Sequence, residues 1–165
     1  MVSKIVNIGM CVVISLCLSA CDPEEGMDPT HQLRYYVTNK SSNNLHTDLY
    51  SITYWSNGDS TCYIERQNDI NIDSTACVWR GKATIDDVEK INNLFYSYFS
   101  GSSIKYIVNV SLNDSLLKQW NSWDTIGINK QFFRESDWSY RTYQNNGEKY
   151  IYHEWTFEIT DNDLQ

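Results

Sequence analysis

Three pairs of β-forming runs, each pair separated by an asparagine-containing turn, most constrain how this chain can fold. LYSITYWS and DSTCYIERQ flank Asn57-Gly58, RTYQN and EKYIYHEWTFEIT flank Asn146-Gly147, and IKYIVNVSL and SLLKQW flank Asn113-Asp114. Asn, Asp and Gly tolerate the positive φ angles that two-residue hairpin turns need. No proline occurs after Pro29 to break these runs. The sequence therefore predicts three β-hairpins.

The last run, YIYHEWTFEIT, has the alternation of a half-buried strand. One face is apolar except for a histidine, and the other is largely polar. The apolar face comprises Ile151, His153, Trp155, Phe157 and Ile159, and the polar face comprises Tyr150, Tyr152, Glu154, Thr156 and Glu158. Two further strands are expected near 34–39 and 76–80.

One segment has helical rather than strand spacing. After Thr84, apolar side chains recur every three or four residues, and Asp86 and Asp87 lie in the first turn, where acidic groups favour a helix start. The pattern predicts one short helix over 85–96. The expected fold is a mainly β protein, an antiparallel β-sandwich of about seven or eight strands with this helix; the alternative is an α+β roll in which the helix covers one sheet face.

The first twenty residues have the three-part pattern of an export signal. Lys4 precedes an apolar stretch that ends in Ser19-Ala20, and Cys21 follows. A membrane-spanning helix is the weaker interpretation, because about 20 apolar residues are needed to cross a bilayer. Leu18-Ser19-Ala20-Cys21 also resembles a bacterial lipobox, which implies removal of 1–20 and lipid attachment to Cys21; the alternative is an ordinary signal peptide with a chance cysteine.

Residues 21–32 contain both prolines and four acids and are expected to form an extended tether, with a single β-sandwich domain over 33–165. The net charge of −8 argues against nucleic-acid binding, because such a chain repels phosphate backbones.

The chain resembles the small lipoproteins abundant in Bacteroidetes, and the resemblance covers nearly all of it. The lipobox followed by acids, YYVTNKSS, YIERQNDINI, SSIKYIVNVSLNDSLLKQW and FFRESDWSYRT carry the likeness. It implies an immunoglobulin-like or transthyretin-like β-sandwich of uncharacterised function. It also implies an outer-membrane lipoprotein whose acids after Cys21 direct it to the cell surface.

Five cysteines are present, of which Cys11 and Cys17 lie in the leader and Cys21 is the expected lipid site. The remaining two, Cys62 and Cys77, are expected to form a disulfide in an exported, oxidising compartment. The alternative is two free thiols, because sequence does not give the distance between them.

The sequence contains no catalytic motif. His31 lies in the expected tether, His46 lies near a strand start, and His153 lies on an apolar strand face, and no two have zinc-ligand spacing. No phosphate-binding glycine loop is present. We therefore expect no enzyme activity, metal or cofactor.

Two features point to surface function instead. Trp120, Trp123 and Trp138 fall in or beside a long expected loop, where they either stack on a sugar or protein ligand or anchor the loop in the core. Four Asp-Ser/Thr triplets resemble the Bacteroidetes O-glycosylation acceptor, although Asp and Ser also favour turns; their hydroxyls belong to Ser60, Ser74, Ser115 and Thr125.

Two functions therefore compete. The first is a lipid-anchored module at the membrane that binds a glycan or protein ligand through loop tryptophans. The second is an envelope or fimbrial assembly component that adds a strand to a partner at a sheet edge.

Overall fold

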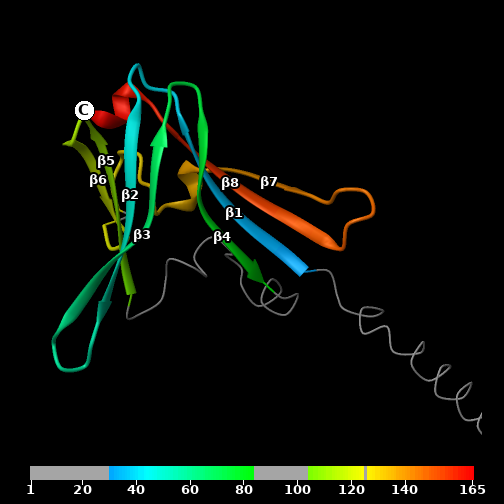
Figure 1. The fold of residues 1–165 in the computed structure, drawn as a ribbon, viewed down its shortest axis with the longest axis horizontal. Coiled ribbons are helices and arrows are strands. Elements are labelled where there is room, and N and C mark those ends of the chain that lie inside the picture. The colour runs from blue at the N-terminus through cyan, green and yellow to red at the C-terminus, as the bar shows by residue number, and fades with distance from the viewer. Residues whose placement is uncertain (1–29, 84–103, 125) are drawn as a thin grey trace, which may run out of the picture.

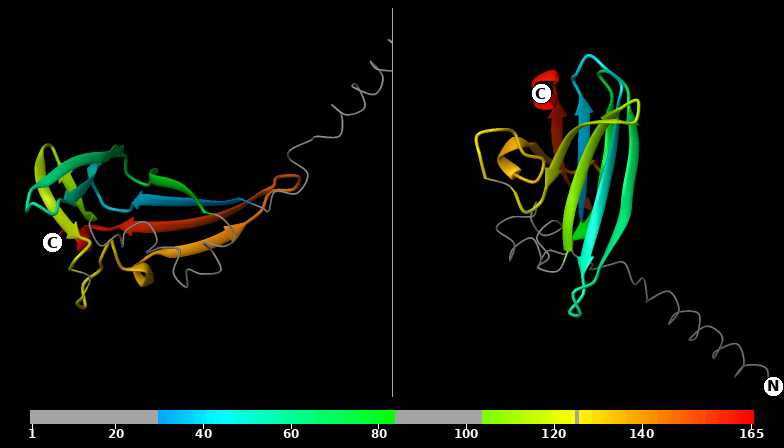
Figure 2. Two further views of the ribbon diagram at one scale, coloured as in Figure 1. Left: turned by 90° about the horizontal axis from the view of Figure 1, so that it is seen from below. Right: turned by 90° about the vertical axis from the view of Figure 1, so that its left-hand side faces the viewer.

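The computed structural model describes residues 30–83, 104–124 and 126–165, and these form two four-stranded β-sheets. Sheet A has the order β4-β1-β8-β7 and sheet B the order β3-β2-β5-β6. The strands of the two sheets run in different directions, as Figures 1 and 2 show. The expected mainly β sandwich is therefore confirmed, with eight strands in the described residues. The helix expected over 85–96 lies outside the described residues.

The strand bounds follow the expected hairpins. Sheet A contains β1 (Thr30–Asn39), β4 (Thr75–Ala83), β7 (Ser139–Tyr143) and β8 (Tyr150–Ile159), and sheet B contains β2 (Leu45–Tyr54), β3 (Ser60–Ile70), β5 (Ile104–Leu112) and β6 (Ser115–Asn121). Two short 3₁₀ helices complete the elements, η1 (Glu135–Asp137) and η2 (Asp161–Leu164).

Only the β5–β6 turn has the predicted two-residue form, with φ angles of 49° and 64° at Asn113 and Asp114. The other two turns are longer loops, 55–59 and 144–149, in which Gly58 and Gly147 have positive φ angles of 91° and 82°. β2–β3, β5–β6 and β7–β8 are antiparallel neighbours across these turns. One pairing departs from an antiparallel sandwich: β1 and β8 run parallel, with Thr30 opposite Tyr150 and Asn39 opposite Ile159.

β1 begins at Thr30, before the expected domain start at residue 33. His31 therefore does not lie in the tether: it is buried in β1, and its Nδ1 is 2.7 Å from Nε2 of His153.

The core lies between the sheets and is rich in aromatic rings. Tyr35 of β1 stacks on Trp155 of β8 with ring centroids 4.9 Å apart. Trp120 of β6 meets Phe157 of β8 edge-on at 5.3 Å, so side chains from both sheets share one core. The buried residues that form this core are Leu33, Tyr35, Val37, Leu45, Leu49, Ile70, Val78, Ala83, Tyr106, Val108, Val110, Trp120, Phe132, Phe133, Trp138, Trp155, Phe157 and Ile159.

The expected polar face of β8 is not all solvent-exposed. Glu154 is only 3% exposed because arginines from β1 and β7 and the hydroxyl of Tyr143 surround its carboxylate. Its neighbour on this face, Tyr152, is buried as well.

Candidate ligand-binding face

The outer face of sheet B carries the candidate site, and β2 runs along it. Even-numbered side chains of β2 point away from the core, since the odd-numbered positions from Leu45 to Ser51 are buried. His46 lies near one end of this face and Tyr54 near the other. At about 3.3 Å per residue, these two positions are about 26 Å apart along the strand. Such a face is long enough for several units of an extended ligand.

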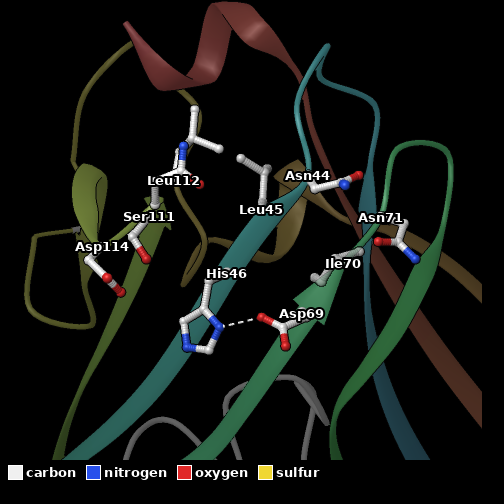
Figure 3. Close-up of a pocket in the computed structure, with 10 residues that line it drawn as sticks. Asn44, Leu45, His46, Asp69, Ile70, Asn71, Ser111, Leu112 and Asp114 are labelled. Carbon is white, nitrogen blue, oxygen red and sulfur yellow. Dashed lines mark hydrogen bonds and ion pairs between the residues drawn. The ribbon is translucent and has the colours of Figure 1, made fainter.

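A groove of about 560 Å³ lies at the His46 end of this face (Figure 3). Its walls come from three segments: the start of β2, the end of β3 with its following turn, and the β5–β6 turn. The lining residues are Asn44, Leu45, His46, Asp69, Ile70, Asn71, Ser111, Leu112, Asn113 and Asp114. Most offer amide, carboxylate or hydroxyl groups, which can bind sugar hydroxyls or backbone amides.

His46 is held between two carboxylates. Its Nδ1 lies 2.7 Å from Asp69 and its Nε2 lies 3.0 Å from Asp48. The hydrogen bond to Asp69, together with the Asp48 contact and the charges of both acids, outweighs burial and raises the pKa of His46 above its ordinary value. When the imidazole is protonated, both of its nitrogens donate to these carboxylates.

An aromatic cluster occupies the other end of the face. The Lys105 ammonium of β5 lies 5.2 Å from the Tyr54 ring centroid and 5.1 Å from the Trp123 ring centroid. Tyr54 and Trp123 are 46% and 48% exposed. The adjacent Trp55 is exposed as well and donates its indole N–H to Thr61. Two half-exposed rings that share one cation offer a surface for a planar or ring-shaped ligand.

Two of the three tryptophans expected at a ligand site are core residues instead. Trp120 and Trp138 are buried, and their indole N–H groups donate to the carbonyls of Lys130 and Phe132. The β6–β7 segment folds back on the sandwich and places Phe132 against both rings. Only Trp123 of the three is exposed to ligands.

The expected disulfide is also wrong for this structure: Cys62 and Cys77 are free thiols. Cys62 lies near the start of β3, whereas Cys77 lies near the start of β4, just after the turn that ends β3. Because a strand rises about 3.3 Å per residue and Cys62 lies at the far end of β3 from this turn, the Cα atoms of Cys62 and Cys77 are much farther apart than the roughly 7 Å that a disulfide allows.

The glycosylation candidates lie in different settings. Ser60 and Ser115 are exposed at the starts of β3 and β6, and Ser74 is half-buried in the turn before β4. Thr125 and Cys21 lie outside the described residues. Among the described residues, no helix is long and apolar enough to cross a membrane, and no cluster of three His, Cys, Asp or Glu side chains is placed to hold a metal ion.

Comparison with known proteins gives no relative: no family model, no curated protein and no solved structure matches this chain. The site therefore rests on its own geometry. Sequence reasoning missed the groove and the Tyr54–Lys105 pair, although the alternation of LHTDLYSITY already separates His46 and Tyr54 from the buried side.

Proposed function

We propose that this protein is a lipid-anchored, non-enzymatic binding module of the cell envelope, and that it holds a glycan along the outer face of sheet B. The lipobox-like sequence before Cys21 supports export and anchoring at an outer-membrane surface. The exposed rings of Tyr54 and Trp123 around Lys105 support glycan binding. This cluster is the observation on which the proposal depends.

The two ends of the face have complementary chemistry for a sugar chain. Rings stack on the apolar faces of sugars, and groove groups such as Asp69 and Asn113 can exchange hydrogen bonds with hydroxyls. Between them the face carries further amides, with Gln119 donating to Asn109 and Gln67 donating to Asp48.

A matched pair of tyrosines tests the glycan site. Tyr54 and Tyr63 are exposed to similar extents, 46% and 53%. Tyr63, however, lies opposite the inward-facing Ser51, on the other side of sheet B. Tyr54→Ala and Trp123→Ala should each weaken binding on a glycan array about tenfold or more, while Tyr63→Ala should not. Equal binding by all three variants would exclude this face as the glycan site.

Anchoring has its own test, which does not depend on the ligand. Wild-type protein should incorporate radiolabelled fatty acid in a bacterial host, and the Cys21→Ser variant should not. Incorporation that persists in Cys21→Ser would show that Cys21 is not the anchor.

Strand addition at β6 is the second candidate function. β6 has one neighbour among the described strands, carries a single charge, Lys118, and exposes Leu116 and Leu117. An edge with a single charge and exposed leucines favours addition of a partner strand more than an edge rich in charges does. β3, the other edge of this sheet, contains Glu65, Arg66 and Asp69. An envelope protein that co-purifies with wild type and is lost with Leu117→Pro would support this role over glycan binding.

A further inference from the structure

Positive charge is concentrated on the outer face of sheet A, in the half where β1 begins. Five basic side chains and two acidic ones lie in or beside this half of the sheet: Arg34, Arg80, Lys82, Arg141, Lys149, Glu148 and Glu154. The other described residues carry six basic and twelve acidic side chains. This face is therefore locally basic within an acidic chain.

The strand register aligns the central charges in one row. Arg34 of β1 lies opposite Arg80 of β4 on one side and Glu154 of β8 on the other, and Glu154 lies opposite Arg141 of β7. The row therefore crosses all four strands with three guanidinium groups and one carboxylate. Lys82 is the next residue after Arg80 on the same face of β4, and it lies opposite Gln32 of β1.

Only part of this charge is neutralised. Glu154 binds Arg141 at 2.7 Å and Arg34 at 3.4 Å. Arg80 instead donates to the sulfur of Cys77 at 3.2 Å, which is a weak acceptor. No carboxylate of the described residues pairs with Arg80 or Lys82, and both side chains are exposed. Within the part of the chain that the structure describes, Arg80 and Lys82 are thus exposed cations without a carboxylate partner, beside the row formed by Arg34, Glu154 and Arg141.

Tyrosine rings lie next to these cations. The Arg34 guanidinium lies 4.2 Å from the Tyr152 ring centroid, and Tyr152 stacks on Tyr143 with centroids 5.0 Å apart. Tyr36 follows Arg34 on the same face of β1. Guanidinium groups bind carboxylate and sulfate groups through paired hydrogen bonds, and tyrosine rings pack against sugar rings.

We propose that this basic face is a second binding site and that its ligand is an acidic glycan with uronate or sulfate groups. The site is separate from the outer face of sheet B and requires neither the lipid anchor nor the Trp123 site. An anionic bilayer is a poorer partner, because Asp22, Glu24, Glu25 and Asp28 precede β1. Acidic side chains repel an anionic bilayer.

A charge-reversal pair tests this site with the full chain. Arg80→Glu/Lys82→Glu should weaken binding to heparin and to polygalacturonate about tenfold or more, because each charge-assisted hydrogen bond contributes strongly. The matched control is Arg66→Glu/Lys118→Glu on sheet B, which makes the same change in net charge and should retain wild-type affinity. Arg80→Gln, which removes the charge but keeps a polar side chain, should show a smaller loss in the same direction.

Three outcomes would overturn the proposal. The first is equal loss in the two charge-reversal pairs, which would indicate a non-specific effect of net charge. The second is unchanged binding in Arg80→Glu/Lys82→Glu. The third is tighter binding to phosphatidylglycerol vesicles than to both polyanions, which would identify a membrane partner. Trp123→Ala should retain heparin binding, so that failure of the sheet B site is distinguished from failure of this one.

Discussion

At the scale of single residues, Glu154 is the charged side chain whose loss should cost most. It is 3% exposed, accepts the Tyr143 hydroxyl at 2.7 Å and pairs with Arg34 and Arg141. Glu154→Gln preserves the shape but leaves both arginines without their counter-charge. We expect a loss of about 1–3 kcal/mol in the free energy of unfolding, measured by chemical denaturation. Glu158 lies on the same strand but is exposed, so Glu158→Gln is the control and should change the free energy of unfolding by no more than about 0.5 kcal/mol. Equal effects would contradict the assigned role of Glu154.

The same carboxylate gives a pH signature. Burial alone would raise the pKa of Glu154, but the Tyr143 and Arg141 hydrogen bonds and the charges of Arg141 and Arg34 outweigh it, so this pKa lies below its ordinary value. A depressed carboxylate pKa stabilises the fold above the unfolded-state pKa of about 4.3, and this contribution is lost as pH falls through the folded-state value. The stability gap between wild type and Glu154→Gln should therefore be constant near neutral pH and narrow under acid conditions.

His46 and His153 should respond to pH in opposite directions. Burial, followed by the charge of His31, lowers the pKa of His153, so its contribution to stability falls as pH drops below the unfolded-state value of about 6.5. The raised pKa of His46 gives a contribution that is full below about 6.5 and lost as pH rises through the folded-state value. Denaturation at pH 8 and pH 5 should show the penalty of His46→Gln growing at pH 5 and that of His153→Gln shrinking. Parallel changes would contradict these environments.

At the scale of elements, the β5–β6 turn provides a direct test of backbone strain. Asn113 and Asp114 both have left-handed backbone, which Asn and Asp tolerate and β-branched residues do not. Asp114→Val should therefore cost about 1–2 kcal/mol of stability by thermal or chemical denaturation. Ser115→Val, one residue later at the exposed start of β6, is the matched control, because β-branched residues suit strands. An equal loss of stability in both variants would show that the left-handed backbone at Asp114 does not specifically disfavour a β-branched residue.

The elements also show what sequence could predict. Local signals sufficed for the hairpins, since Asn57-Gly58, Asn113-Asp114 and Asn146-Gly147 fix turns from short-range chemistry alone. The parallel pairing of β1 with β8 joins residues that are 120 positions apart in the first pair, Thr30 and Tyr150, and no local pattern encodes such a contact.

The candidate sites depend on contacts between segments that are far apart in the sequence. Glu154 alternates like a solvent-facing residue, and it is buried only because Arg34 and Arg141 arrive from other strands. The disulfide prediction failed because composition gives the number of cysteines but not the distance between them, and the fold separates Cys62 from Cys77. The groove at His46 likewise depends on Ser111 and Asp114 from another hairpin.

At the scale of the whole molecule, the two sheets share an aromatic core, and so we expect them to unfold together. Trp120 of sheet B packs against Phe157 of sheet A and against Phe132 of the β6–β7 segment. Trp120 is 1% exposed, whereas the nearby Trp123 is 48% exposed. The same type of side chain is therefore a core residue at one position and half exposed at the other.

Paired substitutions of these two tryptophans separate stability from binding. Trp120→Ala removes a ring between the sheets and should cost about 3–5 kcal/mol in the free energy of unfolding. Trp123→Ala should change it by no more than about 0.5 kcal/mol. Far-ultraviolet and near-ultraviolet circular dichroism should follow one coincident transition for Trp120→Ala, because loss of the shared core destabilises both sheets. Two separate transitions would show that the sheets fold as independent units, and a large loss for Trp123→Ala would assign this ring to structure rather than to a ligand.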